Sequence, residues 1–185
     1  MTAADFATLT DGLAIGRGAL QALHASLQSH APAAAIAVLQ EAGFASGEGI
    51  YQTFIAWLPA GAGVASADQL DGGRLSPVLS AFFEAHGWGP LSVTPLRGGA
   101  LALDSEAWAE AEPGAAEAPM CFFSAGMLAD FLSRLSGETV AVMEVECRCR
   151  GDERCRFLSA MPETLQRVYE AMTAGQNYEE ALTGT

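Results

Sequence analysis

Positive charge is scarce in this sequence. Nine Lys and Arg residues stand against 22 Asp and Glu residues, so the formal net charge is −13 at pH 7. A surface with this charge repels phosphate backbones and anionic lipid headgroups. We therefore expect no direct binding to nucleic acid, and we attribute most of the charge to solubility.

Long apolar runs are absent as well. No run approaches the roughly 20 residues that a membrane-spanning helix needs, and residues 1–12 lack the basic segment and apolar core of a signal peptide. The expected location is therefore cytoplasmic, with no membrane span. A reducing cytosol keeps thiols free, which favours metal binding over disulfides for the four cysteines.

The common catalytic motifs are missing too. There is no G-x-S-x-G segment around a nucleophilic serine. Neither Gly-rich stretch is followed by Lys-Ser or Lys-Thr, and no nicotinamide or flavin motif is visible. These absences favour a protein with no enzymatic activity of its own.

The length of 185 residues suits one domain with a substantial core. We divide the chain into a flexible arm over residues 1–12, a ligand-binding domain over 13–160 and a helical extension over 161–185. Pro59 is expected to end a helix, Ser76 and Pro77 to begin the next, and residues 60–73 to form a loop between them. Apolar spacing and Gly or Pro residues predict helices over 13–29, 32–43, 48–58, 76–86, 121–137 and 162–175.

Strands complete the expected fold. Residues 91–96 and 100–103 read as an antiparallel pair, and residues 139–146 are rich in β-branched residues. A turn over 150–153 then leads into a returning strand that begins at Cys155. The predicted fold class is α/β in the α+β sense, a twisted antiparallel sheet with packed helices.

All four cysteines fall between residues 121 and 157. A hairpin would hold Cys147 and Cys155 on either side of its turn, and Cys121 at the start of the preceding helix can close over them. Zinc needs about four N, S or O ligands, so these thiols indicate a zinc site at the C-terminal hairpin. The alternative is four ordinary buried cysteines, since free cysteine is among the most buried residue types.

Two residues are candidates for the fourth ligand. Cys149 lies two residues after Cys147, on the same strand face if the strand is still regular there. Glu144 lies three residues before Cys147 and needs a bulge or a strand end to converge. Spacing alone slightly favours Cys149.

Three segments of the cysteine region form a specific pattern: Cys-x3-Ala-Gly-x-Leu-Ala from Cys121, Glu144-x2-Cys147, and Gly-Asp-x2-Cys-x-Phe ending at Phe157. This pattern resembles the 4-vinyl reductase domain family. Weaker likeness over residues 41–48 and 87–89 extends the resemblance to about residues 15–160. That family shares its fold with the sensor domains of phenol- and xylene-responsive bacterial activators and with Bet3-like vesicle-tethering subunits.

The resemblance implies a zinc ion held by three cysteines and one glutamate, as in the aromatic sensors. Carried over residue by residue, the ligands are Cys121, Glu144, Cys147 and Cys155. The resemblance overrides the preference from spacing and makes Cys149 a bystander. Because protein groups fill all four positions, such a zinc would be structural.

The resemblance also implies a function. We expect a domain that binds a small hydrophobic or aromatic ligand and whose bound state is read by an effector protein or through a homodimer. The alternatives are tetrapyrrole binding in bacteriochlorophyll synthesis and a non-enzymatic assembly module. The family's N-terminal helices dimerise, which points to the helix with Leu20, Leu23 and Leu27; alternatively these leucines face the protein's own sheet.

An apolar cavity is expected where large rings on three helices face small residues of the helix after Cys121. In the related sensors a His and a Trp hold the phenolic hydroxyl, which points to His86 and Trp108. The alternatives are a helix-end histidine and ordinary aromatic packing. The walls lack the tyrosines of those sensors, which favours a more apolar or larger ligand than phenol. The expected lining residues are Phe54, Trp57, Phe82, Phe83, His86, Trp108, Ala125, Phe131 and Val142.

Overall fold

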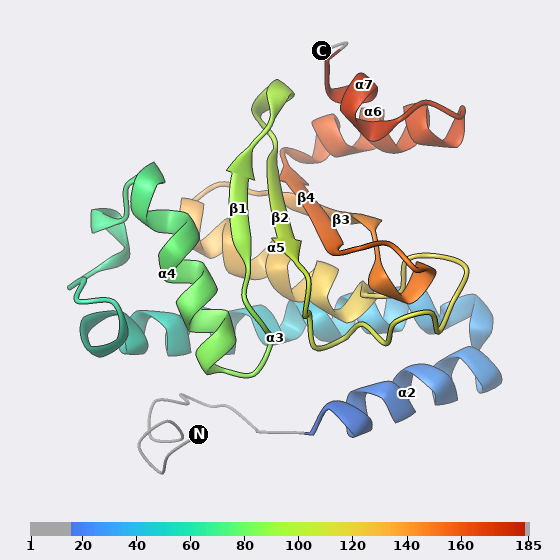
Figure 1. Cartoon of the computed structure of the whole chain (residues 1–185), viewed down its shortest axis with the longest axis horizontal. Helices are drawn as coiled ribbons and strands as arrows, with labels where there is room; N and C mark the ends of the chain where they lie inside the picture. The colour runs from blue at the N-terminus through green and yellow to red at the C-terminus, as the bar shows by residue number, and fades with distance from the viewer. Residues whose placement is uncertain (1–15, 184–185) are drawn as a thin grey trace.

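The computed structural model describes residues 16–183 (Figure 1). The arm expected over residues 1–12, and the start of the helix expected from residue 13, lie outside the described residues. In chain order the elements are α2 (Arg17–His30), α3 (Pro32–Gly61), α4 (Gly72–Ala85), β1 (Ser92–Pro95), β2 (Leu101–Ser105), α5 (Phe122–Ser136), β3 (Ala141–Glu146), β4 (Cys155–Ala160), α6 (Pro162–Thr173) and α7 (Tyr178–Thr183).

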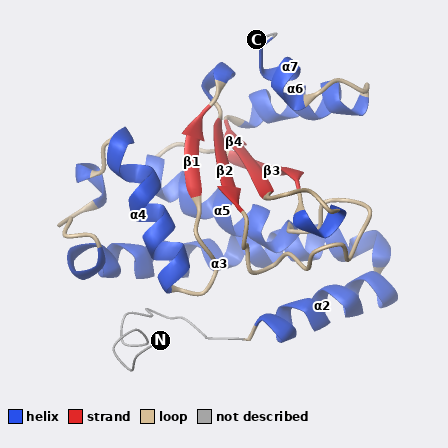
Figure 2. Ribbon diagram, viewed as in Figure 1, coloured by secondary structure: helices blue, strands red, loops and turns tan. Residues whose placement is uncertain are grey.

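One antiparallel sheet of four strands, in the order β1-β2-β4-β3, forms the centre of the fold (Figure 2). β4 pairs with β2 on one side and with β3 on the other. Helices pack on this sheet, so the predicted α+β class is confirmed. The predicted pair of β1 and β2 and the predicted hairpin of β3 and β4 are both present.

Two cores lie on opposite faces of the sheet. Every residue of β4 is buried, and successive side chains of a strand point to opposite faces. Phe157 belongs to the larger core with α3, α4 and α5, whereas Leu158 belongs to the smaller core with α6 and α7. The C-terminal helices therefore cover one face of the sheet, and the cysteine-bearing helix α5 covers the other.

α3 is one continuous helix where the sequence predicted two. Gly43 and Gly47 do not interrupt it; they allow α5 to pack closely, since a β-carbon on Gly43 would lie 1.9 Å from the backbone oxygen of Phe123. Pro59 does not end the helix either. It lies in the last turn, which reaches Gly61, where a missing N–H costs little. Although α3 has 30 residues, no helix in the described part of the chain is long and apolar enough to cross a membrane.

α4 begins earlier than predicted. Asp71 is its N-cap in place of Ser76, because the Asp71 carboxylate accepts a hydrogen bond from a backbone N–H of the first turn at 2.9 Å. Pro77 lies inside the helix instead of at its start. The loop expected over residues 60–73 is shortened at both ends and contains a 3-10 turn (Ala67–Gln69).

α2 packs on α3 at the outer edge of the molecule (Figure 1). Leu20 is buried against its own chain, whereas 45% of Leu23 is exposed. The apolar stripe of α2 is therefore divided between the protein's own core and its surface. The homodimer stays a prediction.

Replacing Gly126 by alanine should destabilise the protein. A β-carbon at Gly126 would lie 2.1 Å from the backbone oxygen of Gln40, so α3 and α5 must move apart. We expect the free energy of unfolding in urea to fall by about 1–3 kcal/mol, as for other overpacked cores.

Gly18→Ala in α2 is the matched control, because nothing lies within 4 Å of the added β-carbon. It should leave the stability unchanged or raise it slightly. Equal urea midpoints for Gly126→Ala and the wild type would contradict the close approach of the two helices.

Candidate metal centre

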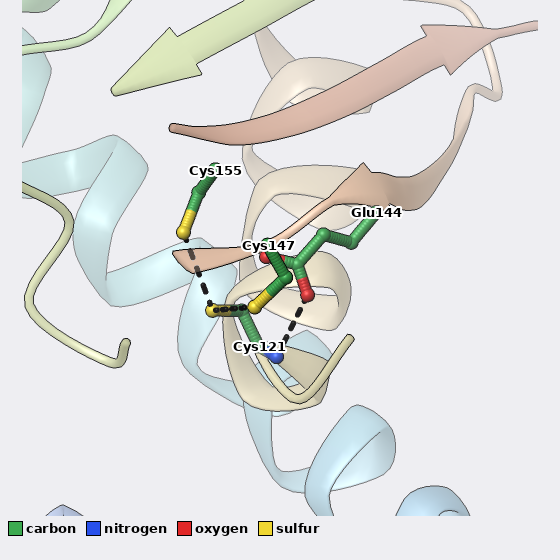
Figure 3. Close-up of side chains that lie close together, drawn as sticks. All are labelled: Cys121, Glu144, Cys147 and Cys155. Atoms are coloured by element: carbon green, nitrogen blue, oxygen red, sulfur yellow. Dashed lines mark hydrogen bonds between the residues drawn. The ribbon is translucent and has the colours of Figure 1, made fainter. Parts of the chain in front are cut away.

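Cys121 stands at the start of α5, where it is the N-cap residue and is fully buried. The helix ends as predicted at Gly137, whose φ of 75° lies in the left-handed region that glycine adopts readily. The Sγ atom of Cys121 lies 3.8 Å from that of Cys147 and 3.9 Å from that of Cys155. The helix start thus places a thiol against the β3–β4 hairpin (Figure 3).

The hairpin supplies the remaining groups of the cluster. Cys147 follows the end of β3, and Cys155 opens β4. The pairing of β3 with β4 shifts register between Glu144 and Glu146. A converging Glu144 requires such an irregularity, and its carboxylate reaches the backbone N–H of Cys121 (Figure 3).

Four potential ligand atoms converge at this point, all within 4.8 Å of one another. They belong to Cys121, Glu144, Cys147 and Cys155. A tetrahedral zinc with Zn–S bonds of roughly 2.3 Å places its sulfur atoms about 3.8 Å apart. The two sulfur–sulfur distances of 3.8 and 3.9 Å agree with that spacing.

One carboxylate oxygen of the cluster lacks a partner. Oε2 of Glu144 accepts a hydrogen bond from the Cys121 N–H at 2.9 Å, whereas the buried Oε1 has no hydrogen-bond partner. A buried polar atom without a partner is costly, and a bound cation removes that cost. Three thiols and a carboxylate are donors that zinc accepts. The residues therefore fit a divalent metal ion, and the cluster could hold one.

The electrostatics of the cluster favour a cation as well. Burial, and after it the charge of Cys147, raises the pKa of Glu144 to about 8. Hydrogen bonds with neighbouring thiols, that of Cys147 first, raise the pKa of Cys121; the corresponding bonds, that of Cys121 first, lower the pKa of Cys147. Negative charge thus gathers on Cys147 at the expense of its buried neighbours. A divalent cation would stabilise the deprotonated form of every ligand.

Cys149 lies outside this group of four. β3 ends at Glu146, and a 3-10 turn (Arg148–Arg150) carries Cys149 away from the strand. Spacing favoured Cys149 only if the strand stayed regular as far as that residue, and the strand does not. The Sγ atom of Cys149 instead accepts a hydrogen bond from the N–H of Glu112 at 3.3 Å.

A second buried carboxylate, that of Glu110, holds the first turn of α5. It accepts hydrogen bonds from the N–H groups of Phe123 and Ser124, at 3.0 and 2.7 Å, and from the Ser124 hydroxyl. Nε2 of His24 lies 2.8 Å from Glu110 Oε1 but is out of line for a hydrogen bond. A carboxylate at this position offsets the partial positive charge of the helix start. No signal in the sequence indicated this role, because Glu110 lies in a loop without a periodic pattern.

The residues predicted to line a ligand cavity come together in the larger core. Five of them are fully buried: Phe54, Phe82, Phe83, Trp108 and Phe131. The centroids of neighbouring rings in this group lie 5.1 to 6.3 Å apart. The others are Ala125, which is buried, and Trp57, His86 and Val142, which are partly buried. Their role in binding a ligand stays a prediction.

The two polar groups expected to bind a ligand hydroxyl already have partners. The Nε1–H of Trp108 donates to the Ser124 hydroxyl at 2.7 Å. Nδ1 of His86 lies 2.7 Å from the backbone oxygen of Phe82, which matches the alternative of a helix-end histidine. A ligand that relied on both groups would have to displace the Trp108–Ser124 bond.

Replacing Glu110 by glutamine should weaken the anchor of α5. The amide keeps the shape of the side chain but loses the charge that accepts bonds from the first turn. We expect the free energy of unfolding to fall by about 1.5–3 kcal/mol, the range for hydrogen bonds to a charged group. Urea denaturation checks this value.

Glu117→Gln is the matched control, because Glu117 is an exposed residue of the same loop. It should unfold as the wild type does. If both variants unfold at the wild-type midpoint, Glu110 does not anchor the helix.

Solved structures with a similar fold are known. The phenol-responsive sensory domain of the transcription activator PoxR, solved with phenol, matches with a TM-score of 0.65 and 20% identity, over 90% of this chain and 84% of that one. A vinyl-4-reductase family protein from Methanocaldococcus jannaschii matches with a TM-score of 0.41 and 20% identity, over 66% of each chain. The fold is therefore shared with the PoxR domain.

The sequence comparisons cover the cysteine region and part of the chain beyond it. MJ0745, an uncharacterised protein of Methanocaldococcus jannaschii, is 33% identical over 79 residues, which are 43% of this chain and 42% of that protein. The match thus spans less than half of that relative. Residues 106–159 match the 4-vinyl reductase domain family, and this segment includes all four residues of the cluster. The resemblance found in the sequence is confirmed: from residue 106 to residue 159 this chain carries a 4-vinyl reductase domain.

Proposed function

We propose that this protein is a zinc-containing domain that binds a small hydrophobic or aromatic molecule, and that a partner protein or a second copy reads the bound state. The cluster of three thiols and one carboxylate at the start of α5 carries the proposal. The fold supports it, because the PoxR domain with the same fold was solved with phenol.

The zinc ion would have a structural role. Its ligands would be Cys121 from the start of α5, Glu144 and Cys147 from β3 and its end, and Cys155 from β4. Four protein ligands leave no position for a substrate. The ion would tie a helix to a hairpin that lies on the same side of the larger core.

The hydrophobic ligand would bind among the aromatic side chains between α3, α4 and α5. These rings are in contact, so a ligand must displace some of them or occupy space at their edge. Trp57, His86 and Val142 are the partly buried residues at that edge. Because Trp108 is already bonded to Ser124, we propose a ligand held mainly by apolar contacts and not by a hydroxyl group.

An assembly module is the second candidate. The fully buried, mutually packed rings of Phe54, Phe82 and Phe83 favour it, since a core that is already closed needs no guest. Such a protein would keep the metal and the fold but would bind no small molecule. The two candidates are therefore separated by a ligand screen and not by metal analysis.

The metal ligands can be identified by elemental analysis. We expect one zinc per chain in the wild type and in Cys149→Ser, because Cys149 lies outside the group of four. Cys121→Ser and Glu144→Gln should lose most of the metal, since each removes one ligand of a buried site. Loss of zinc from Cys149→Ser, with zinc retained in Glu144→Gln, would contradict the assignment.

Ligand binding can be tested by thermal shift with aromatic, fatty-acid and porphyrin compounds. A compound that binds the folded state should stabilise the wild type by about 2.7 kcal/mol at a hundredfold excess over its Kd. Ala125→Phe, which fills the buried face of α5, should lose this gain and retain the zinc.

Ala34→Phe is the control, because it adds the same ring at an exposed position of α3 and should respond to the compound as the wild type does. If no compound raises the wild-type midpoint, the assembly module is the better proposal. If Ala125→Phe responds fully, the ligand binds elsewhere.

A further inference from the structure

A pocket opens next to the metal cluster, on the side of α2. Its volume is about 350 Å³, and its walls come from α2, the loop before α5 and the 3-10 turn after β3. Its lining includes His24, Glu110, Glu112, Met120 and Cys149. None of these residues belongs to the aromatic group where the hydrophobic ligand is proposed to bind.

Cys149 stands between this pocket and the cluster. Its side chain forms part of the pocket wall, although the residue is only 3% exposed. On the other side its thiol interacts with the thiols of Cys121 and Cys147. A single sulfur atom therefore links a pocket open to solvent with a closed set of ligands.

The cluster itself offers no direct access to solvent through its thiols. Cys121, Cys147 and Cys155 are each 0% exposed. A metal ion must exchange its waters for these ligands one at a time, and a buried site needs an entry path along which donor atoms replace the waters. The pocket presents such donors in Nε2 of His24, which has no hydrogen bond, and in the Glu112 carboxylate.

We propose that this pocket is the route by which the metal ion enters and leaves, and that Cys149 is an exchange ligand that binds the ion transiently between solvent and the four resident ligands. This inference rests on the proposed metal site. The Cys149 thiol loses its proton to solvent as its sulfur replaces a water on the ion. It regains a proton when the ion moves on and the resident thiolates replace it.

The rates of metal exchange test this role. Metal-free protein is mixed with Co²⁺, whose bonds to thiolate give an ultraviolet absorption band, and the loaded protein is then mixed with a chelator. Cys149→Ser should slow both loading and release by about tenfold, which corresponds to a barrier raised by roughly 1.4 kcal/mol. Equal slowing in both directions leaves the Kd for Co²⁺ and the intensity of the band unchanged.

A second pair of variants tests the route without changing any thiol. Ala25→Trp places a large ring in the wall of the pocket and should also slow both rates. Ala22→Trp adds the same ring to an exposed position of α2 outside the pocket, and should exchange metal at the wild-type rates.

The outcomes separate this inference from the proposed metal site. If the wild type binds no Co²⁺ or Zn²⁺, the metal site itself is wrong. If the wild type binds metal and Cys149→Ser exchanges it at the same rates, only the exchange role is wrong. If Cys149→Ser binds metal much more weakly and with a weaker absorption band, Cys149 is a resident ligand, which also overturns the exchange role.

Discussion

The first turn of α5 is the point on which this structure depends. The free N–H groups at a helix start need acceptors, and two buried carboxylates reach this turn from different parts of the chain. Glu144, from the irregular end of β3, accepts the N–H of Cys121. Glu110, from the preceding loop, accepts those of Phe123 and Ser124. The same carboxylates place negative charge beside three buried thiols, and this is the environment that a cation stabilises.

The position of α5 along α3 follows from glycine on both helices. Gly43 and Gly47 on α3 and Gly126 on α5 leave no room for a side chain, so the two backbones lie in close contact. This contact fixes Cys121 relative to the hairpin and also presses the ring of Phe131 into the aromatic core. The metal cluster and the proposed ligand site therefore share one rigid helix, which offers a physical link between metal binding and ligand binding.

Local signals in the sequence predicted most of the elements around the site. Gly137 ends α5, the β-branched run forms β3, and the irregularity that a converging Glu144 needs is present as a register shift. The misses concern contacts between distant segments. Gly43 reads as a helix end but serves packing against α5, and Glu110 reads as part of a loop but binds a helix start. No pattern within either segment carries that information, because the partner lies far along the chain.

Three sulfur atoms and one oxygen are the proposed metal ligands, and X-ray absorption at the zinc edge of the purified protein measures this shell directly. We expect three sulfur neighbours at about 2.3 Å and one oxygen at about 2.0–2.2 Å. Four sulfur neighbours would place Cys149 in the site instead of Glu144. A shell of oxygen and nitrogen alone would show that the thiols hold no metal, and would contradict the proposed metal link between α5 and the hairpin.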